Sequence, residues 1–165
     1  MFEGWFPLGN NEVIHMLSDL KKGAGQIRLF GRVAFFFNAE RIQKVIEDAI
    51  NEIMAVDQAN SFFDPVNNDL DIYIVGSLAG GTGSGMFMDT AMMCRHIITS
   101  GVTAIEAKIR GYFVLPEVFM NARIGTAKDF ERIYPNAAGA LKELDLFMCE
   151  FPHRHCCIRY RLQLQ

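Results

Sequence analysis

The segment DIYIVGSLAGGTGSGMF, residues 71–87, constrains the fold of this chain more than any other feature. Residues 71–78 are rich in β-branched and aromatic side chains and apolar on both faces, which predicts a central parallel strand buried between helices. Four glycines follow within residues 79–85, and helical spacing of apolar residues resumes at Phe87. Such a turn lets backbone N–H groups approach an anion at a helix N-terminus, so the segment predicts a phosphate-binding loop.

Further elements of an α/β fold flank this segment. Apolar residues at spacings of three and four predict an amphipathic helix over residues 42–54. Residues 108–115 predict a second strand, which Pro116 ends. The predicted order is helix, strand, helix, strand, helix, with connections long enough for parallel pairing of the strands. The other predicted helices are at residues 1–22 and 136–148, and the loops are at 21–32, 60–68 and 116–135.

The sequence also predicts how the chain divides. Two strands are fewer than the roughly five or six of a typical sheet, so we interpret residues 1–148 as the central part of a larger domain. The composition changes at residues 149–165, which carry three arginines and two histidines but no acid after Glu150. We interpret this tail as a truncated or frameshifted end. Its cysteines and histidines lack two separated ligand pairs, so no metal site is predicted there.

Composition and charge exclude several classes of partner. A net charge of −3, with both signs interspersed, provides no field that would attract nucleic acid or a membrane surface. The apolar runs are far shorter than the roughly 20 residues of a membrane-spanning helix, and the N-terminus lacks the layout of a secretion signal. The four cysteines have no framework spacing, which favours reduced thiols. We therefore expect a cytoplasmic protein.

The glycine loop matches neither of two common phosphate-binding motifs. No lysine follows its last glycine, as a Walker loop requires, and a single residue separates its last two glycines where the dinucleotide fingerprint needs two. What remains, A-G-G-T-G-S-G, resembles the nucleotide-binding signature of tubulin and FtsZ. In that family the loop follows a parallel strand, opens a helix and wraps the phosphates of GTP. The resemblance implies phosphate binding by Ala79, Gly80, Gly81, Thr82, Gly83, Ser84 and Gly85.

Two other segments resemble the same family, in the same order along the chain. GAGQIRLFGR, ahead of a long helix, is similar to the family's other phosphate loop, which implies that Gly23, Ala24 and Gly25 lie near the terminal phosphate. A helix-ending turn after Lys22 is the alternative interpretation of these three residues. VLP and ERIYPNAAGALKEL resemble the ribose-side loop and the next helix, which implies Glu117 or Glu131 as a ribose contact. The combination most resembles bacterial tubulin-like proteins. It implies an incomplete, Rossmann-like three-layer nucleotide-binding domain with parallel strands and flanking helices.

The resemblance also implies an activity. In its intact form the protein would bind GTP or GDP with Mg²⁺ and hydrolyse GTP on assembly into a homo-oligomer or filament. The family's upstream glycine loop, its base-reading asparagine region and the acidic loop that completes the next subunit's site have no counterpart here. We therefore expect this chain alone to bind GTP weakly and to be inactive, and no catalytic residue is assigned. Two alternatives stay open, a non-catalytic nucleotide-binding or scaffold module and a small α/β enzyme with another anionic cofactor.

Several residues near the glycine loop have simpler interpretations. Asp89 is expected near the first turn of the loop helix, where an acid favours the helix dipole whatever the function. Arg32 is expected to be solvated or ion-paired rather than bound to phosphate. Gly101 is expected to end the helix in the left-handed conformation. The methionines at 86, 88, 92 and 93 are expected to fill the core.

Overall fold

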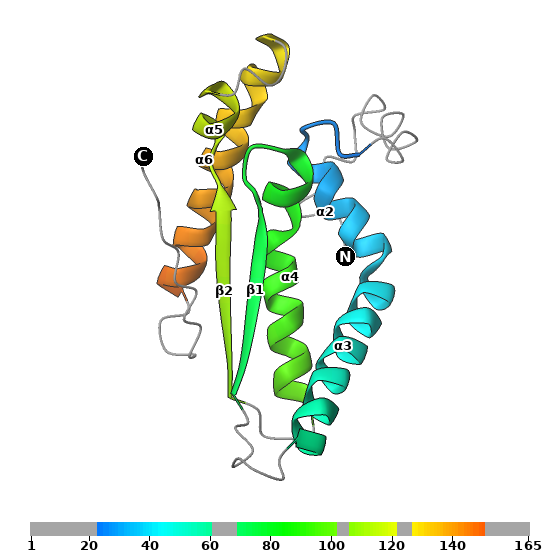
Figure 1. The fold of residues 1–165 in the computed structure, drawn as a ribbon. Helices are drawn as coiled ribbons and strands as arrows, with labels where there is room; N and C mark the ends of the chain where they lie inside the picture. Colours follow the sequence, from blue (N-terminus) through cyan, green and yellow to red (C-terminus); the bar gives the residue numbers. More distant parts are fainter. Residues whose placement is uncertain (1–22, 61–68, 102–105, 122–126, 151–165) are drawn as a thin grey trace.

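The described part of the computed structural model has helices packed against one face of a small parallel sheet (Figure 1). It comprises residues 23–60, 69–101, 106–121 and 127–150. The helix predicted within residues 1–22 and the tail beyond residue 150 lie outside it. The elements are α2 (Arg28–Phe37), α3 (Ala39–Asn60), β1 (Asp69–Ser77), α4 (Gly81–Ser100), β2 (Glu106–Val114), α5 (Pro116–Asn121) and α6 (Ala127–Glu150).

The two strands confirm the predicted parallel pairing. β1 pairs with β2 in a register that runs from Asp69 opposite Glu106 to Ser77 opposite Val114. α4 lies in the connection between them, because a parallel pair needs a long crossover. Both carboxyl ends therefore lie at the same edge of the sheet, the upper edge in Figure 1. Whatever follows the two strands is brought together at this edge.

An apolar core joins the sheet to α4 and α6. Its buried side chains include Leu78, Phe87, Ile109 and Leu144, and the Phe87 ring meets Phe113 edge-on with ring centroids 5.0 Å apart. Removing such apolar surface from water is the main favourable contribution to folding. The core thus confirms the predicted α/β class, with helices flanking a parallel sheet.

The opposite face of the sheet is exposed, so the prediction that β1 is buried on both faces is wrong. Tyr73 is 54% exposed and Val75 is 75% exposed. Tyr112 packs beside Tyr73 with ring centroids 5.9 Å apart, and Arg110 pairs with Asp71 at 2.5 Å while lying over the Tyr73 ring. Apolar side chains on both faces of a strand do not require two covering layers, because cross-strand contacts such as these shield part of their surface.

α2 occupies a segment where the sequence predicts a loop. Glycine is a poor helix former, so the three glycines of residues 21–32 favour the loop prediction, yet the helix begins at Arg28 and includes Gly31. Its buried side chains, Phe30, Val33 and Phe35, form an apolar face. Packing of this helix against α4 outweighs the weak local propensity.

The helix predicted over residues 42–54 is confirmed and extends over the whole of α3. Its apolar stripe is only partly buried, since Ile50 is buried whereas Val45 and Ile53 are largely exposed. The loop predicted at residues 60–68 begins where α3 ends, and the rest of it lies outside the described residues.

Two helices stand in the region 116–135 where the sequence predicts a loop. α5 begins at Pro116, whose fixed φ and missing N–H suit the first helical position. α6 begins at Ala127 and continues through Pro135. A proline inside a helix removes a hydrogen bond and usually ends the helix, which is why the sequence places the start of this helix at Asn136.

Two smaller predictions about α4 are wrong. Gly101 caps the helix with φ −66° rather than in the left-handed region, because its N–H reaches the Ile97 carbonyl at 3.1 Å from an extended conformation. Met88 packs against the core as predicted, but Met92 is 52% exposed. Within the described residues, no helix combines the length and the apolar character needed to cross a membrane.

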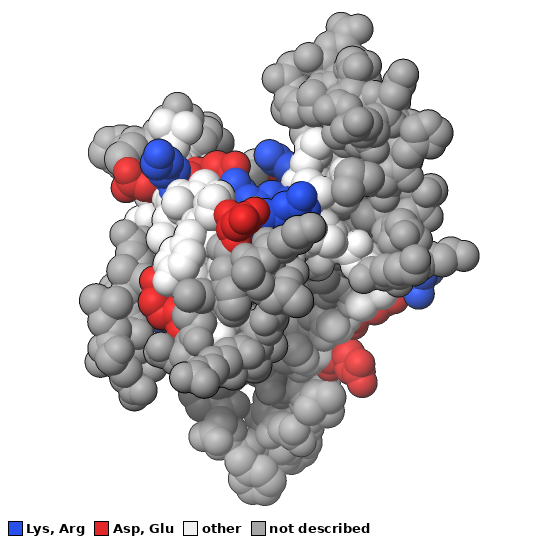
Figure 2. Space-filling view, turned by 90° about the horizontal axis from the view of Figure 1, so that it is seen from above, with Lys and Arg blue, Asp and Glu red and all other residues white. Residues whose placement is uncertain are grey.

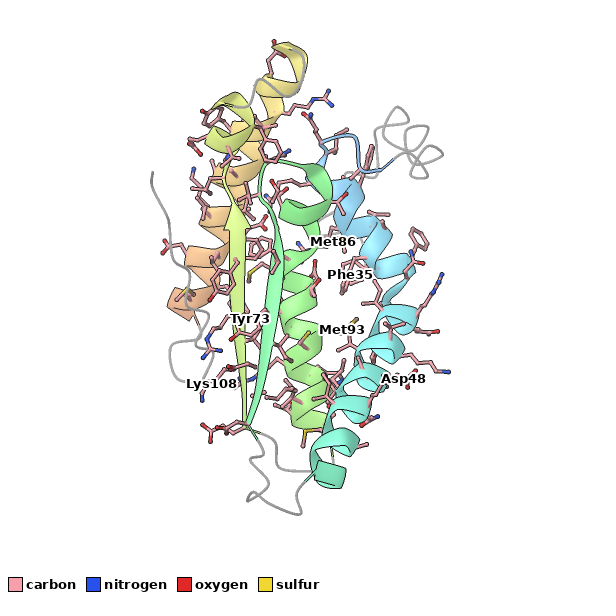
Figure 3. All side chains as sticks on the ribbon, viewed as in Figure 1. Phe35, Asp48, Tyr73, Met86, Met93 and Lys108 are labelled. Atoms are coloured by element: carbon pink, nitrogen blue, oxygen red, sulfur yellow. The ribbon has the colours of Figure 1, made fainter. Side chains whose placement is uncertain are left out.

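An apolar hollow of about 410 Å³ lies between α2, α3 and α4. Figure 3 shows Phe35 and Met86, which line it, in the space between the helices, and Asp48 on exposed α3 surface. The walls offer few polar groups, so this hollow is poorly suited to a charged ligand.

The close contact between α2 and α4 depends on Gly31. A Cβ atom at this position would overlap the Gly81 carbonyl oxygen and lie 2.9 Å from the Thr82 Cα atom. Both are backbone atoms, which cannot move aside as a flexible side chain can. The spacing of α2 and α4 is therefore set by the absence of a side chain.

We expect Gly31→Ala to lower the free energy of unfolding by about 1–3 kcal/mol, because overpacking forces the two helices apart. Urea unfolding followed by circular dichroism measures this change. Gly76→Ala is the matched control, since its added Cβ would meet only the Phe113 ring at 3.9 Å. We expect the control to stay within about 0.5 kcal/mol. Equal losses in both variants would contradict the assigned role of Gly31.

Candidate functional site

The glycine segment forms a short turn between β1 and α4. The turn covers residues 78–80, because β1 ends at Ser77 and α4 begins at Gly81. Its backbone is fixed by two hydrogen bonds, from Leu78 N–H to the Val114 carbonyl at 3.0 Å and from Ala79 N–H to Ser77 Oγ at 3.1 Å. The helix thus starts inside the predicted loop, and most of the motif belongs to its first turns.

The glycines of the motif have two different surroundings. Three of them face backbone that leaves no room for a side chain, and Gly80 alone among the four has open space around its would-be Cβ. The contacts that exclude a side chain are those of Gly81 with Ile27, Gly83 with Ser77 and Gly85 with Arg28. Most of the bare backbone in this motif is therefore required for packing α2 and β1 against α4, and Gly80 is the position left open to a ligand.

The N-terminus of α4 has the properties of an anion site. The amides of Gly81, Thr82 and Gly83 belong to the first turn, where no helical carbonyl can accept from them, and the helix dipole favours negative charge. Thr82 is exposed beside them. Ser84 is fully buried, and its hydroxyl donates to the Gly80 carbonyl one turn earlier, so this side chain is turned into the fold.

The second predicted phosphate loop is a strained turn ahead of α2. Gly23 and Gly25 have φ values of 98° and 53°, in the region that favours glycine, and Gln26 has φ 60°. Nothing lies within 4 Å of a Cβ built on either glycine, while Ala24 is buried and its carbonyl accepts from Ile27 N–H at 2.9 Å. The turn is anchored at its centre and open at both glycines. A non-glycine residue at φ 60° is uncommon and often marks a functional turn.

α6 holds the two glycine loops together. The buried Asn136 side chain donates through Nδ2 to the Gln26 carbonyl at 2.8 Å and to the Ala79 carbonyl at 2.9 Å. Arg132, one turn earlier, reaches the Gly25 carbonyl through Nη1 at 3.5 Å. Sequence reasoning places Asn136 only as the start of a helix. Asn136 shares one face of α6 with apolar residues such as Ile133. A single amide side chain on an apolar helix face indicates a buried polar group that has hydrogen-bond partners.

A second cross-link joins α2 to α4 and α6. The Arg28 guanidinium donates from Nε and Nη2 to the Ser84 carbonyl at 3.1 and 3.0 Å, and Nη2 also meets Glu143 Oε2 at 2.5 Å. A charged donor strengthens these hydrogen bonds relative to neutral ones. This arginine therefore fixes the entry of α2 beside the first turns of α4.

Arg32 forms an ion pair with Asp89, as one of the two sequence interpretations predicts. Arg32 Nη2 donates to Asp89 Oδ1 at 3.1 Å, and Nε approaches Oδ2 at 3.0 Å without hydrogen-bond alignment. The position of Asp89 differs from the prediction, because α4 begins at Gly81 and Asp89 lies beyond the first turn. Burial raises the pKa of Asp89, and the positive charge of Arg32 opposes that rise.

The two glutamates predicted as ribose contacts lie at the same end of the fold as the glycine loops. Glu117 is in the first turn of α5, directly after the carboxyl end of β2, and Glu131 is on α6 next to Arg132. Both are exposed. Figure 1 shows α5 and the start of α6 at the upper end, where the turn before α4 also lies.

The charge at this end of the fold is mixed. Figure 2 looks down on it and shows, among the described residues, Lys and Arg side chains directly beside Asp and Glu side chains, with no broad surface of one sign in that part of the chain. Over the described ranges, no group of three or more His, Cys, Asp or Glu residues is placed to hold a metal ion. Attraction of an anion would therefore depend on the amides of the α4 N-terminus more than on side-chain charge.

These features define a strand, glycine turn and helix unit of an α/β domain with two adjoining loops at the carboxyl edge of its sheet. A comparison with protein families matches residues 1–164 to the family described as tubulin like. The chain therefore belongs to the tubulin-like family, which confirms the tubulin/FtsZ resemblance found in the sequence. No match was found among curated proteins or among solved structures.

The raised pKa of Asp89 predicts the sign of a pH effect. A buried acid with a raised pKa stabilises the fold below its ordinary pKa, near pH 4, and loses that contribution as pH rises through the folded-state value. Relative to Asp89→Asn, which stays neutral, the wild-type free energy of unfolding should thus fall as the pH rises above about 4. Urea titrations of both proteins at several pH values measure the difference. A difference that rises with pH would show that the ion pair with Arg32 outweighs burial.

Proposed function

We propose that this chain binds GTP, with the phosphates of the nucleotide at the N-terminus of α4. The observation that carries this proposal is the open position at Gly80 beside the first-turn amides of α4, with the second glycine loop tied next to it. Membership of the tubulin-like family supports GTP rather than another anionic cofactor. A cytoplasmic location, where GTP is abundant, agrees with this function.

The groups of predicted site residues would contact different parts of the nucleotide. The motif from Ala79 to Gly85 supplies the phosphate cradle, with contacts from the amides of its early residues and from the Thr82 hydroxyl. Its later glycines allow the close packing that aims those amides. Gly23, Ala24 and Gly25 would lie near the terminal phosphate, and Glu117 or Glu131 would contact the ribose.

Magnesium would accompany the nucleotide and offset part of its charge. Among the described residues there is no carboxylate cluster to hold the ion alone, so its ligands would come chiefly from the phosphates, with the Thr82 hydroxyl within the same cradle. The protein's own contribution would be to orient the phosphates and to keep the cradle rigid.

The second part of the proposal is that the protein hydrolyses GTP when it self-assembles. Membership of the tubulin-like family supports this part. If assembly of further copies completes the active site, the rate of GTP hydrolysis per protomer should rise with protein concentration. A GTP-binding protein whose hydrolysis stays at background at every concentration would be a non-catalytic nucleotide-binding or scaffold module instead. The two outcomes separate the activity from the binding.

Thr82→Asp tests the phosphate site without disturbing the fold. An acid in the first turn favours the helix dipole by about 0.3–1 kcal/mol, so the variant should be at least as stable as the wild type. The same charge would repel the phosphates, so affinity for GTP should fall about tenfold or more. Binding is measured by equilibrium dialysis with labelled GTP, at protein concentrations high enough for weak affinity.

Thr82→Asn is the matched control for that charge. It has nearly the same size as the acid, so it should retain most of the GTP affinity. If wild type and both variants bind GTP equally, or if none binds, the nucleotide does not use the N-terminus of α4.

A further inference from the structure

We propose that Asn136 is a positioning residue that sets the spacing between the two glycine loops and thereby selects ligands long enough to contact both. This inference rests on the proposed function, since it concerns how the same site distinguishes nucleotides by the length of their phosphate chain. Asn136 would not contact the nucleotide. It would act through the two backbone carbonyls that its amide group holds.

The first observation is that one amide nitrogen bridges two distant segments. Asn136 Nδ2 has two hydrogens, and each has a partner, the Gln26 carbonyl at 2.8 Å and the Ala79 carbonyl at 2.9 Å. Gln26 directly follows the Gly23–Gly25 loop, and Ala79 directly precedes Gly80. A single planar group thus links the backbone beside both loops, in addition to the contacts of α2 with the first turns of α4.

The second observation is that the bridge is shielded from water. Asn136 is 7% exposed, Ala79 is 3% exposed, and Ala137 and Ala140 beside them on α6 are buried. A buried donor that lost its acceptors would carry an uncompensated desolvation cost, so the arrangement with both bonds made is strongly favoured. The spacing is therefore held before any ligand arrives.

The third observation is that the open positions of both loops are glycines with no atom packed against them. The backbone around Gly23 and Gly25 has φ values suited to glycine, and no atom lies within 4 Å of a Cβ built on either residue. Gly80 has the same open space. Glycine has the greatest backbone freedom, so a tether on each side of the open positions has the largest effect on them.

Selection by length follows from this geometry. A ligand with one phosphate meets the N-terminus of α4 alone, whereas a triphosphate extends from that helix toward the second loop. Fixing the distance between the loops reduces the ordering cost for the longer ligand and leaves the shorter one unaffected. Asn136 should thus contribute to the preference for GTP over GMP rather than to phosphate binding in general.

The experiment compares the affinities of the full chain for GTP and GMP in wild type, Asn136→Ala and Asn136→Asp. We expect both variants to lose affinity for GTP by about tenfold while affinity for GMP changes less than about twofold. Asn136→Asp should have the larger effect, because it places carboxylate oxygens against two carbonyl oxygens. Asp145→Asn, further along α6 on exposed surface, is the control and should leave the ratio unchanged.

Equal losses for both nucleotides would mean that Asn136 only supports the fold, and an unchanged GTP affinity would also overturn the proposal. Amide hydrogen exchange without nucleotide separates this proposal from the proposed function. If no protein binds GTP, the proposed function fails, but the tether still predicts faster exchange in Asn136→Ala at both residues 24–27 and 79–83. Faster exchange spread evenly over α6 and the sheet, or at neither loop, would overturn the tether itself.

Discussion

The close approach of α2 to the first turns of α4 is the contact on which the site depends. It places Gly31 against Gly81 with no side chain between the helices, and it brings the loop before α2 beside the turn before α4. Burial of the apolar face of α2 stabilises the contact, and the Arg28 guanidinium holds its end to the Ser84 carbonyl. Without this approach, the two glycine loops would be separate features of the chain.

Parallel pairing supplies the other half of the geometry. Because β1 and β2 run in the same direction, the turn before α4 and the start of α5 share one edge of the sheet. α6 then crosses that end and adds Asn136 between the loops. Segments far apart in the sequence thus meet where backbone amides are unpaired within their helix, which is the usual place for ligands in α/β folds.

The sequence predicts the parts of this fold that depend on local periodicity. Both strands, α3 and the strand–turn–helix order follow from apolar spacing and from the glycines after β1. α2 and the first turns of α6 do not follow, because Gly31 and Pro135 are poor helix formers and only tertiary packing retains them. The tether at Asn136 is also hidden, since its partners are carbonyls of residues that lie 110 and 57 positions away.

The different surroundings of the motif's glycines change what its presence in a sequence can tell. A relative that no longer bound nucleotide would still need Gly81, Gly83 and Gly85, because any side chain there would push α4 away from its neighbours. Natural selection for a stable fold would therefore be enough to retain these three glycines. Gly80 and Thr82 are under no such steric restriction, so they would drift once ligand binding was lost. Across the family, the residues at these two positions therefore indicate which members still bind a nucleotide better than the three packed glycines do.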